Sequence, residues 1–285
     1  MPGRAPTGES SGYVARVSSQ VLRSAGQLLR PPLHPRSALA ARRLGRQSLL
    51  LIAIGGVAIA ALMYLLDAYE IALMPPRGTP GLWPVRILTD FGKDANVVGV
   101  LVVMLAAVAL ISPVLHGFLR MRWLRLGLNL EFFLAAVLVP LLAGELIKWI
   151  VGRGRPFVGG HANPFNFVPF ARTEAYASFP SAHAITSAAL AFAVSSVWPR
   201  TKGVVIIYVV AIAATRLLLL AHHPSDVVGG ALIGLVGAMW VRYWFAARRL
   251  GFAIRHDGAI TPPIGLPPGP GIGPRKGVAR GPSTP

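Results

Sequence analysis

The sequence predicts an all-α membrane protein in which six transmembrane helices form one bundle. Of the 285 residues, 54% are hydrophobic and only 13% are charged, which is far more apolar than a soluble domain. Six apolar segments approach the roughly 20 residues that a helix needs to cross the hydrocarbon core. Four of these segments hold ionisable residues, and such groups at membrane depth normally face the interior of a bundle.

The six predicted spans fall into two groups. The first two, at 49–66 and 96–115, carry no charged residue and can face lipid. The other four lie at 128–150, 182–198, 203–221 and 227–245. These four spans or their ends hold Glu131, Glu145, Lys148, His183, Arg216, His222, Asp226 and Arg242. We therefore expect the later spans to surround the functional centre.

Basic residues set the expected orientation of the bundle. The chain has 28 Lys and Arg against 10 Asp and Glu, a formal net charge of +18. Basic residues near the span ends lie in the N-terminal segment, in the second and fourth connectors and after the last span, all on one side of a six-span bundle. That side, with both termini, is expected to be cytoplasmic in a cell inner (plasma) membrane. Nucleic-acid binding is disfavoured because no soluble domain collects these charges on one face.

The N-terminal segment, residues 1–48, has an amphipathic pattern. Apolar side chains repeat at helical spacing between Val14 and Leu28. Three arginines recur every seven residues on the opposite face: Arg16, Arg23 and Arg30. The pattern is typical of a basic helix on a membrane surface, so anionic lipids of the cytoplasmic face are expected partners. A disordered tail and an organellar transit peptide are the alternatives.

Composition sets the remaining limits on the chain. The membrane domain is predicted to occupy residues 49–246. Residues 247–285 are basic and rich in Pro and Gly, which predicts a disordered cytoplasmic tail, most clearly from Thr261 onward. The absence of cysteine excludes a disulfide framework, a thiolate metal site and a cysteine nucleophile. The oligomeric state is left open.

Three polar clusters lie at span ends that this topology places on the outer side of the membrane. They are Lys148, Arg155 and Pro156; Pro180, Ser181, Ala182 and His183; and Arg216, His222 and Asp226. The second cluster opens a predicted helix, whose first free backbone N–H groups point toward any bound anion. Charge and hydropathy alone therefore bring all three clusters to one membrane face.

The spacing within these clusters resembles the motifs of the type 2 phosphatidic acid phosphatase family, which is related in fold to vanadium-dependent haloperoxidases and glucose 6-phosphatase. The first motif, Lys-x6-Arg-Pro, is complete. In the second, Pro-Ser-Gly-His, Ala182 replaces glycine, and in the third, Ser-Arg-x5-His-x3-Asp, Thr215 replaces serine. Alanine resists a positive φ but still supplies a backbone N–H, and threonine keeps the hydroxyl. The resemblance implies this family's helical bundle for the membrane domain.

The resemblance and the chemistry of phosphoryl transfer imply the same roles. His222 is expected to attack phosphorus, with Asp226 accepting a hydrogen bond from the other ring nitrogen. His183 is expected to protonate the leaving oxygen and then to activate water. The expected phosphate-binding residues are Lys148, Arg155, Ser181, Ala182 and Arg216. Because three cations can replace the charge of magnesium, no metal and no other cofactor is expected.

Two neighbouring residues have alternative interpretations. His223 adjoins the expected nucleophile but lacks the spacing of the motif. Glu145 lies three residues before Lys148 on the same helix face, so pairing with that lysine is favoured over contact with a substrate head group.

The predicted activity is hydrolysis of a phosphomonoester or pyrophosphate on a lipid that enters from the bilayer. The resemblance offers undecaprenyl pyrophosphate, phosphatidylglycerophosphate, phosphatidic acid and lipid A 1-phosphate as substrates without ranking them. One alternative is a lipid phosphotransferase that uses the same site. Another is a non-catalytic lipid-binding or transport protein whose buried polar residues only hold the bundle together.

Overall fold

The computed structural model describes residues 8–76, 78–156, 158–159 and 162–262, and these are mainly helical. The helices are α1 (Gly8–Leu29), α2 (Ser37–Leu65), α3 (Asp67–Leu73), α4 (Trp83–Asp90), α5 (Asp94–Ile111), α6 (Gly117–Val151), α7 (Ala182–Val197), α8 (Lys202–Leu218) and α9 (Pro224–Ala247). Single 3₁₀ turns lie at Pro80–Leu82, Ser112–Val114, Glu174–Tyr176 and Pro199–Thr201. A short hairpin joins β1 (Ala253–Ile254) to β2 (Ile260–Thr261).

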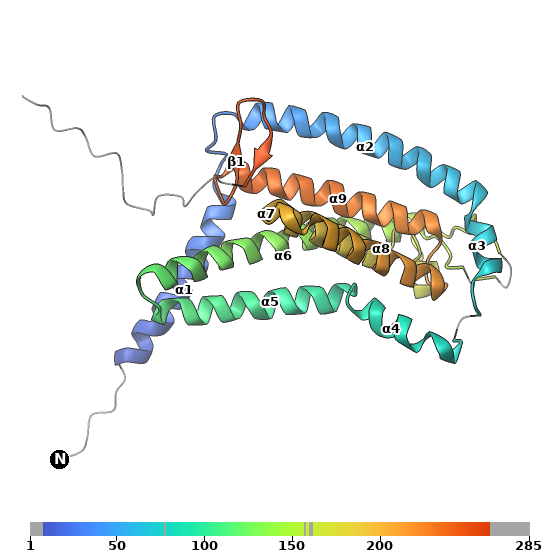
Figure 1. Cartoon of the computed structure of the whole chain (residues 1–285), viewed down its shortest axis with the longest axis horizontal. Coiled ribbons are helices and arrows are strands. Elements are labelled where there is room, and N and C mark those ends of the chain that lie inside the picture. Colours follow the sequence, from blue (N-terminus) through green and yellow to red (C-terminus); the bar gives the residue numbers. More distant parts are fainter. Residues whose placement is uncertain (1–7, 77, 157, 160–161, 263–285) are drawn as a thin grey trace, which may run out of the picture.

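The long helices run side by side as one bundle (Figure 1). Five segments of the described chain are long and apolar enough to cross a membrane: Ser37–Leu65, Pro80–Val114, Gly117–Val151, Pro199–Leu218 and Pro224–Ala247. Helix α7 is apolar but has only 16 residues. Each predicted span is therefore a helix, and the predicted all-α membrane bundle is confirmed. Helix α2 starts at Ser37, before the predicted start at residue 49, because the arginines ahead of the apolar run do not interrupt a helix.

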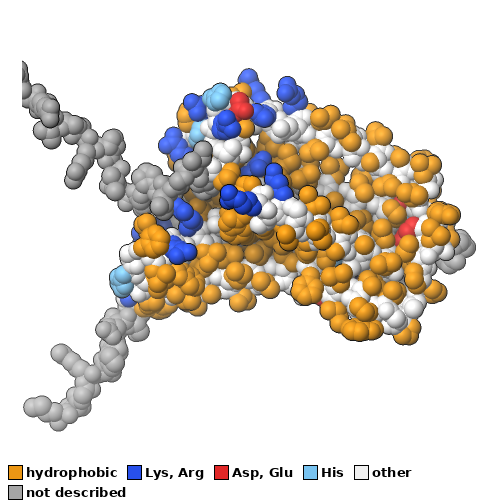
Figure 2. All heavy atoms as spheres, in the orientation of Figure 1, with side chains coloured by type: hydrophobic (Ala, Val, Ile, Leu, Met, Phe, Trp, Pro, Cys, Tyr) orange, Lys and Arg blue, Asp and Glu red, His pale blue; other side chains and the backbone are white. Residues whose placement is uncertain are grey.

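Apolar side chains cover most of the surface seen in Figure 2, as expected for helices that face lipid. Examples of large exposed apolar residues are Val57 in α2, Val103 in α5 and Ile207 in α8. Lys and Arg gather in the left half of this view, toward the end of the bundle that carries α1 and the hairpin. The bundle thus has one basic end and one end with few exposed charges in this view.

Glycines in α9 bring its neighbours close. A Cβ atom at Gly230 would lie 2.5 Å from the Ser181 carbonyl oxygen, and one at Gly234 would lie 2.4 Å from that of Ile185. Stripes of small residues allow helix backbones to approach in this way inside membranes. Helix α7 is therefore packed along α9, and the first residues of the two helices lie next to each other.

Helix α1 is docked on the basic end of the bundle. The Tyr13 hydroxyl donates a hydrogen bond to the Leu110 carbonyl at 2.5 Å, and the Ser112 hydroxyl donates to the Gln20 side chain at 2.8 Å. The indole N–H of Trp244 donates to the Leu28 carbonyl at 3.0 Å. These bonds join α1 to the ends of α5 and α9, so this segment is part of the folded molecule.

The hairpin after α9 corrects the prediction that residues 247–285 are disordered. Its strands pair antiparallel, with Ala253 opposite Thr261 and Ile254 opposite Ile260. Phe252 and Ile254 are buried, and the Phe252 ring lies edge-on to Phe132 of α6 at 4.8 Å between centroids. Apolar anchors within a polar, Gly-containing segment therefore order residues 248–262. The rest of the predicted tail, 263–285, lies outside the described residues.

Candidate active site

The three predicted clusters meet at the end of the bundle opposite α1. Helices α6 and α8 end here, and α7 and α9 begin here (Figure 1). Lys148 lies in the last turn of α6 and Arg216 in the last turn of α8. His222 interacts electrostatically with Arg216, Arg155 and His183. Residues from four helix ends are thereby assembled into one site.

A cavity of about 310 Å³ adjoins these residues. Its lining comprises Gly78, Leu82, Arg86, Arg155, Arg216, Leu219 and Ala221. Arg155 and Arg216 were predicted to bind phosphate, but Arg86 of α4 was not. A single arginine in a short connector carries no sequence signal of such a role. Three arginines around one cavity fit an anionic group, and the leucines beside them fit an apolar chain.

His222 is buried next to this cavity, with 4% of its surface exposed. Its Nδ1 lies 2.8 Å from the Ser178 carbonyl oxygen. Because a carbonyl only accepts hydrogen bonds, Nδ1 carries the proton and Nε2 keeps its lone pair. Burial and the positive charges of Arg216 and Arg155 lower the pKa of His222 well below its ordinary value. The side chain is therefore neutral near pH 7, the state that a nitrogen nucleophile requires.

Asp226 does not make the direct hydrogen bond to His222 that the sequence predicted. Its Oδ2 lies 3.9 Å from His222 Nδ1, which is beyond hydrogen-bond distance. Oδ2 instead accepts bonds from the Ser178 hydroxyl at 2.6 Å and from the His223 backbone N–H at 2.9 Å. The Ser178 carbonyl takes the expected place at Nδ1. The i, i+4 spacing of His222 and Asp226 could not predict this acceptor, because it is a backbone carbonyl 44 residues away in the chain.

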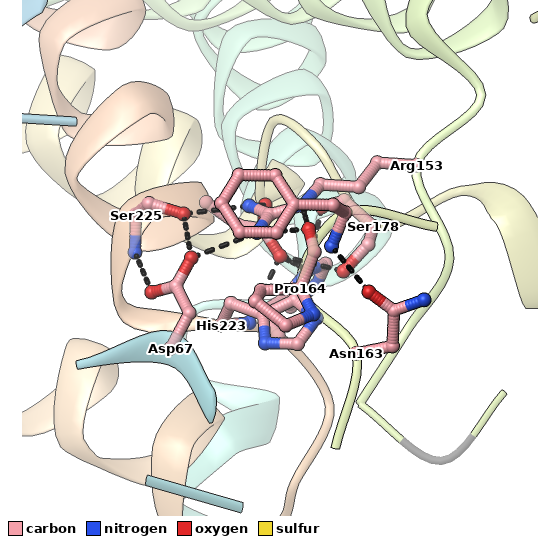
Figure 3. A network of polar contacts seen from close by, with 10 residues as sticks. Asp67, Arg153, Asn163, Pro164, Ser178, His223 and Ser225 are labelled. Carbon is pink, nitrogen blue, oxygen red and sulfur yellow. Dashed lines mark hydrogen bonds and ion pairs between the residues drawn. The ribbon is translucent and has the colours of Figure 1, made fainter. Parts of the chain in front are cut away.

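Arg153 is the principal site residue that sequence reasoning missed. It is 1% exposed and forms ion pairs with Asp226 at 2.6 Å and with Asp67 of α3 at 2.7 Å (Figure 3). It stands between Lys148 and Arg155 of the first motif, where it was not distinguished from other basic residues. The available signal was the pair Asp67 and Asp226, two acids that the predicted topology places on the outer side and that need a basic partner.

The start of α7 offers donors to an anion. The Ser181 N–H donates to the Asp226 carbonyl at 3.1 Å, while its buried hydroxyl has no hydrogen-bond partner within the described part of the chain. The next N–H groups, from Ala182 onward, belong to the first turn of α7 and lack intrahelical acceptors. Ala182 is helical and is not among the non-glycine residues with positive φ. Alanine therefore fits this position of the motif without strain.

Helix α4 orients Arg216. The guanidinium donates to the Thr89 hydroxyl at 2.7 Å, and the Thr215 hydroxyl contacts the same oxygen at 3.0 Å. Thr215 thus preserves the hydroxyl of the family motif. Lys148 pairs with Glu145, so the predicted pairing of these two side chains is confirmed.

The three clusters lie within a region that matches a known family. The model of the PAP2 superfamily matches residues 129–250, which contain all three clusters. Residues 129–250 are therefore similar to the PAP2 superfamily. This confirms the family that the three motifs predicted. The PAP2 region runs from within α6 to just after α9, whereas Asp67, Arg86 and Thr89 lie before it.

Individual relatives of the chain are bacterial proteins. A lipid A 1-phosphatase of Rhizobium johnstonii is 34% identical over 126 residues, which cover 44% of this chain and 51% of that protein. A lipid A 1-phosphatase of Rhizobium etli is 29% identical over 218 residues, or 74% and 90% of the two chains. The bacitracin transport permease protein BcrC of Bacillus licheniformis is 24% identical over 167 residues, or 57% and 79%. No solved structure matches the chain.

Within the PAP2 region, three of the predicted phosphate-binding residues are cations. These are Lys148, Arg155 and Arg216. Among the described residues, no group of three or more His, Asp or Glu side chains is arranged to hold a metal ion. The site can thus hold an anion and present it to a neutral histidine.

Proposed function

We propose that the protein is an integral membrane phosphatase that hydrolyses a lipid-linked phosphomonoester or pyrophosphate through a phosphohistidine at His222, without a metal. The observation that carries this proposal is the state of His222. Its Nδ1–H is held by the Ser178 carbonyl and its pKa is lowered, so that Nε2 keeps a lone pair, and the residue before it, Ala221, lines the arginine-lined cavity. The PAP2 match and the lipid phosphatase relatives support the same activity.

The first step forms a bond between His222 Nε2 and phosphorus. The bond between phosphorus and the lipid oxygen breaks, and His183 gives its proton to that oxygen. Arg155, Arg216 and Lys148 stabilise the charge on the equatorial oxygens.

In the second step, His183 takes a proton from water, and the water oxygen bonds to phosphorus. The P–N bond then breaks and returns its electron pair to Nε2 of His222, which is neutral again.

Lipid A 1-phosphate is the first substrate to test, because two relatives are named for it. The reacting phosphate would occupy the cavity, while the apolar chains remain in the bilayer against the exposed apolar helices. We place this site on the outer face of the inner membrane and α1 with both termini on the cytoplasmic face. The gathering of Lys and Arg at the opposite end of the bundle supports this orientation, as does the positive-inside rule (Figure 2). The arginines of α1 would then bind anionic lipids.

The test measures phosphate release by the purified full-length protein in detergent. The panel contains lipid A 1-phosphate, undecaprenyl pyrophosphate, phosphatidylglycerophosphate and phosphatidic acid, with and without a chelator. We expect release from at least one lipid, and a loss of several orders of magnitude in His222→Ala. His256→Ala, in the exposed turn of the hairpin, is the matched control and should retain activity.

Three outcomes contradict the proposal. Full turnover by His222→Ala would exclude the nucleophile, and loss of activity with the chelator would exclude a metal-free reaction. Reaction in oxygen-labelled water without label in the released phosphate would indicate a phosphotransferase.

A further inference from the structure

A fully buried polar network connects α3 to the start of α9 (Figure 3). Arg153 is at its centre, and all five guanidinium N–H groups have acceptors. The acceptors are the Pro164 carbonyl (3.1 Å from Nε and 2.8 Å from Nη2), the Ser225 hydroxyl (2.6 Å), Asp226 Oδ1 (2.6 Å) and Asp67 Oδ2 (2.7 Å). Gly152, with φ of 56°, turns the chain after α6 so that Arg153 enters the interior. Such complete use of its donors fixes the guanidinium in one orientation.

Asp67 brings α3 into this network. It is 0% exposed, and its Oδ1 accepts the Ser225 backbone N–H at 3.1 Å. Its Oδ2 accepts the Ser225 hydroxyl as well as Arg153. The carboxylate therefore holds the first turn of α9, which carries Asp226, from a helix outside the PAP2 region.

Ser178 connects the network to His222. Its N–H donates to the Arg153 carbonyl at 3.0 Å, and its hydroxyl donates to Asp226 Oδ2 at 2.6 Å. Its carbonyl accepts the Nδ1–H of His222 at 2.8 Å. One residue thus carries the connection from the Asp226 carboxylate to the histidine ring.

The network carries a net negative charge, which stabilises a positively charged group next to it. Two carboxylates and one guanidinium leave one net negative charge buried close to His222. A phosphohistidine ring that retains its Nδ1 proton is positively charged, so this net charge stabilises it.

We propose that Asp67 and Arg153 are positioning residues for His222, acting through Asp226 and Ser178. The inference rests on the proposed phosphohistidine mechanism and extends its machinery to α3. In this arrangement the ion pairs hold the Ser178 carbonyl at the distance that fixes the ring and its tautomer. A displacement of the ring by about 1 Å reduces turnover by about 100-fold, whereas the cations that bind the phosphate stay in place.

The experiment compares Asp67→Asn, Arg153→Lys and Ser178→Ala in the full-length protein in detergent. Arg153→Lys keeps the charge but loses the planar fork, and Ser178→Ala keeps the carbonyl but loses the bond to Asp226. Asp257→Asn is the matched control, because Asp257 pairs with Arg43 at 3.1 Å in an exposed position at the other end of the bundle. The readouts are the folded fraction, kcat, KM and the inhibition constant of inorganic phosphate.

We expect kcat per folded molecule to fall by about 100-fold in Asp67→Asn and by at least about 10-fold in the other two variants. KM and the phosphate inhibition constant should stay within about threefold of wild type, and the control should be unchanged. A fall in kcat with unchanged KM and phosphate affinity indicates a positioning role. A merely structural role would reduce the folded fraction and leave kcat of the folded protein intact.

Two results overturn the inference: folded variants with wild-type kcat, or a parallel loss of kcat and phosphate affinity. Removing one partner from a buried ion pair is strongly destabilising, so Asp67→Asn can fail to fold. Arg153→Lys and Ser178→Ala then decide. Wild-type and His222→Ala proteins in the same assay keep the two proposals distinguishable, since an active His222→Ala protein refutes the mechanism itself.

Discussion

At the scale of single residues, protonation is controlled by burial and by neighbouring charge. His222 is kept neutral by burial and two arginines, and Glu70 of α3 shows the opposite case. Glu70 is 7% exposed, and its carboxylate oxygens have no hydrogen-bond partner within the described residues. Burial and the negative charges of Asp67 and Asp226 raise the pKa of Glu70 to about 8. A proton on this carboxyl prevents a third negative charge from forming beside the network.

This raised pKa predicts a specific dependence of stability on pH. Between the ordinary pKa of 4.5 and about 8, the unfolded chain has lost the Glu70 proton while the folded chain retains it. The free energy of unfolding therefore falls as pH rises through this range and levels off above it. Glu70→Gln should remove this part of the loss, so its thermal midpoint should fall less than that of wild type between the two pH limits. Equal losses in both proteins would refute the assignment, and Glu174→Gln, in an exposed loop, is the control.

Residue spacing identified the motif side chains but not the groups that orient them. His222, Arg216 and Lys148 could be predicted because their types and intervals form a pattern. Ser178 acts on His222 through a backbone carbonyl, which every residue possesses, so its identity carried no signal. The Asp67–Arg153 pair spans 86 positions in the chain, and only the folded structure brings the two charges together.

At the scale of elements, the site depends on how closely α7 approaches α9. Gly230 and Gly234 allow the backbone of α7 to lie directly against α9. The same contact places Ser181 beside Asp226, where their backbones form a hydrogen bond at 3.1 Å. The start of α7, where we propose that an anion binds, and the network around α9 are therefore positioned by one helix interface.

Gly234→Val tests this interface. A Cβ at this position would meet the Ile185 carbonyl oxygen at 2.4 Å, so the two helices must separate. We expect a loss of about 2 kcal/mol or more in stability and a large loss of turnover. Thermal unfolding and phosphate release would measure both. The matched control is Gly56→Val in α2, where a new Cβ meets nothing within 4 Å, and equal effects of the two substitutions would contradict the packing argument.

Long apolar runs made the main helices of the bundle predictable from sequence, whereas shorter elements could not be predicted. Helices α3 and α4 could not be predicted, because neither has an apolar run long enough to indicate a membrane span. The hairpin after α9 could not be predicted, because Phe252 and Ile254, which are buried, are isolated apolar residues in a Gly-containing segment. These short elements matter, since α3 and α4 supply Asp67, Arg86 and Thr89 to the site.

At the scale of the whole molecule, the charge distribution predicts its orientation in the membrane. The chain has no cysteine, so single-cysteine variants report on one position each. Thr173→Cys lies in an exposed part of the loop before α7, and His256→Cys lies in the hairpin at the basic end. An impermeant thiol reagent on intact cells should label the first variant, and label the second only after the cytoplasm is opened. The reverse pattern would invert the proposed topology.

Transfer of phosphate through His222 is tested most directly by trapping the intermediate. Purified protein is mixed with a radiolabelled lipid phosphate, quenched with base within one turnover, digested and mapped. A phosphohistidine at His222 predicts an acid-labile, base-stable label on the peptide that contains this residue, absent from His222→Ala and retained by His256→Ala. Label on another residue, or complete turnover by His222→Ala, would contradict it.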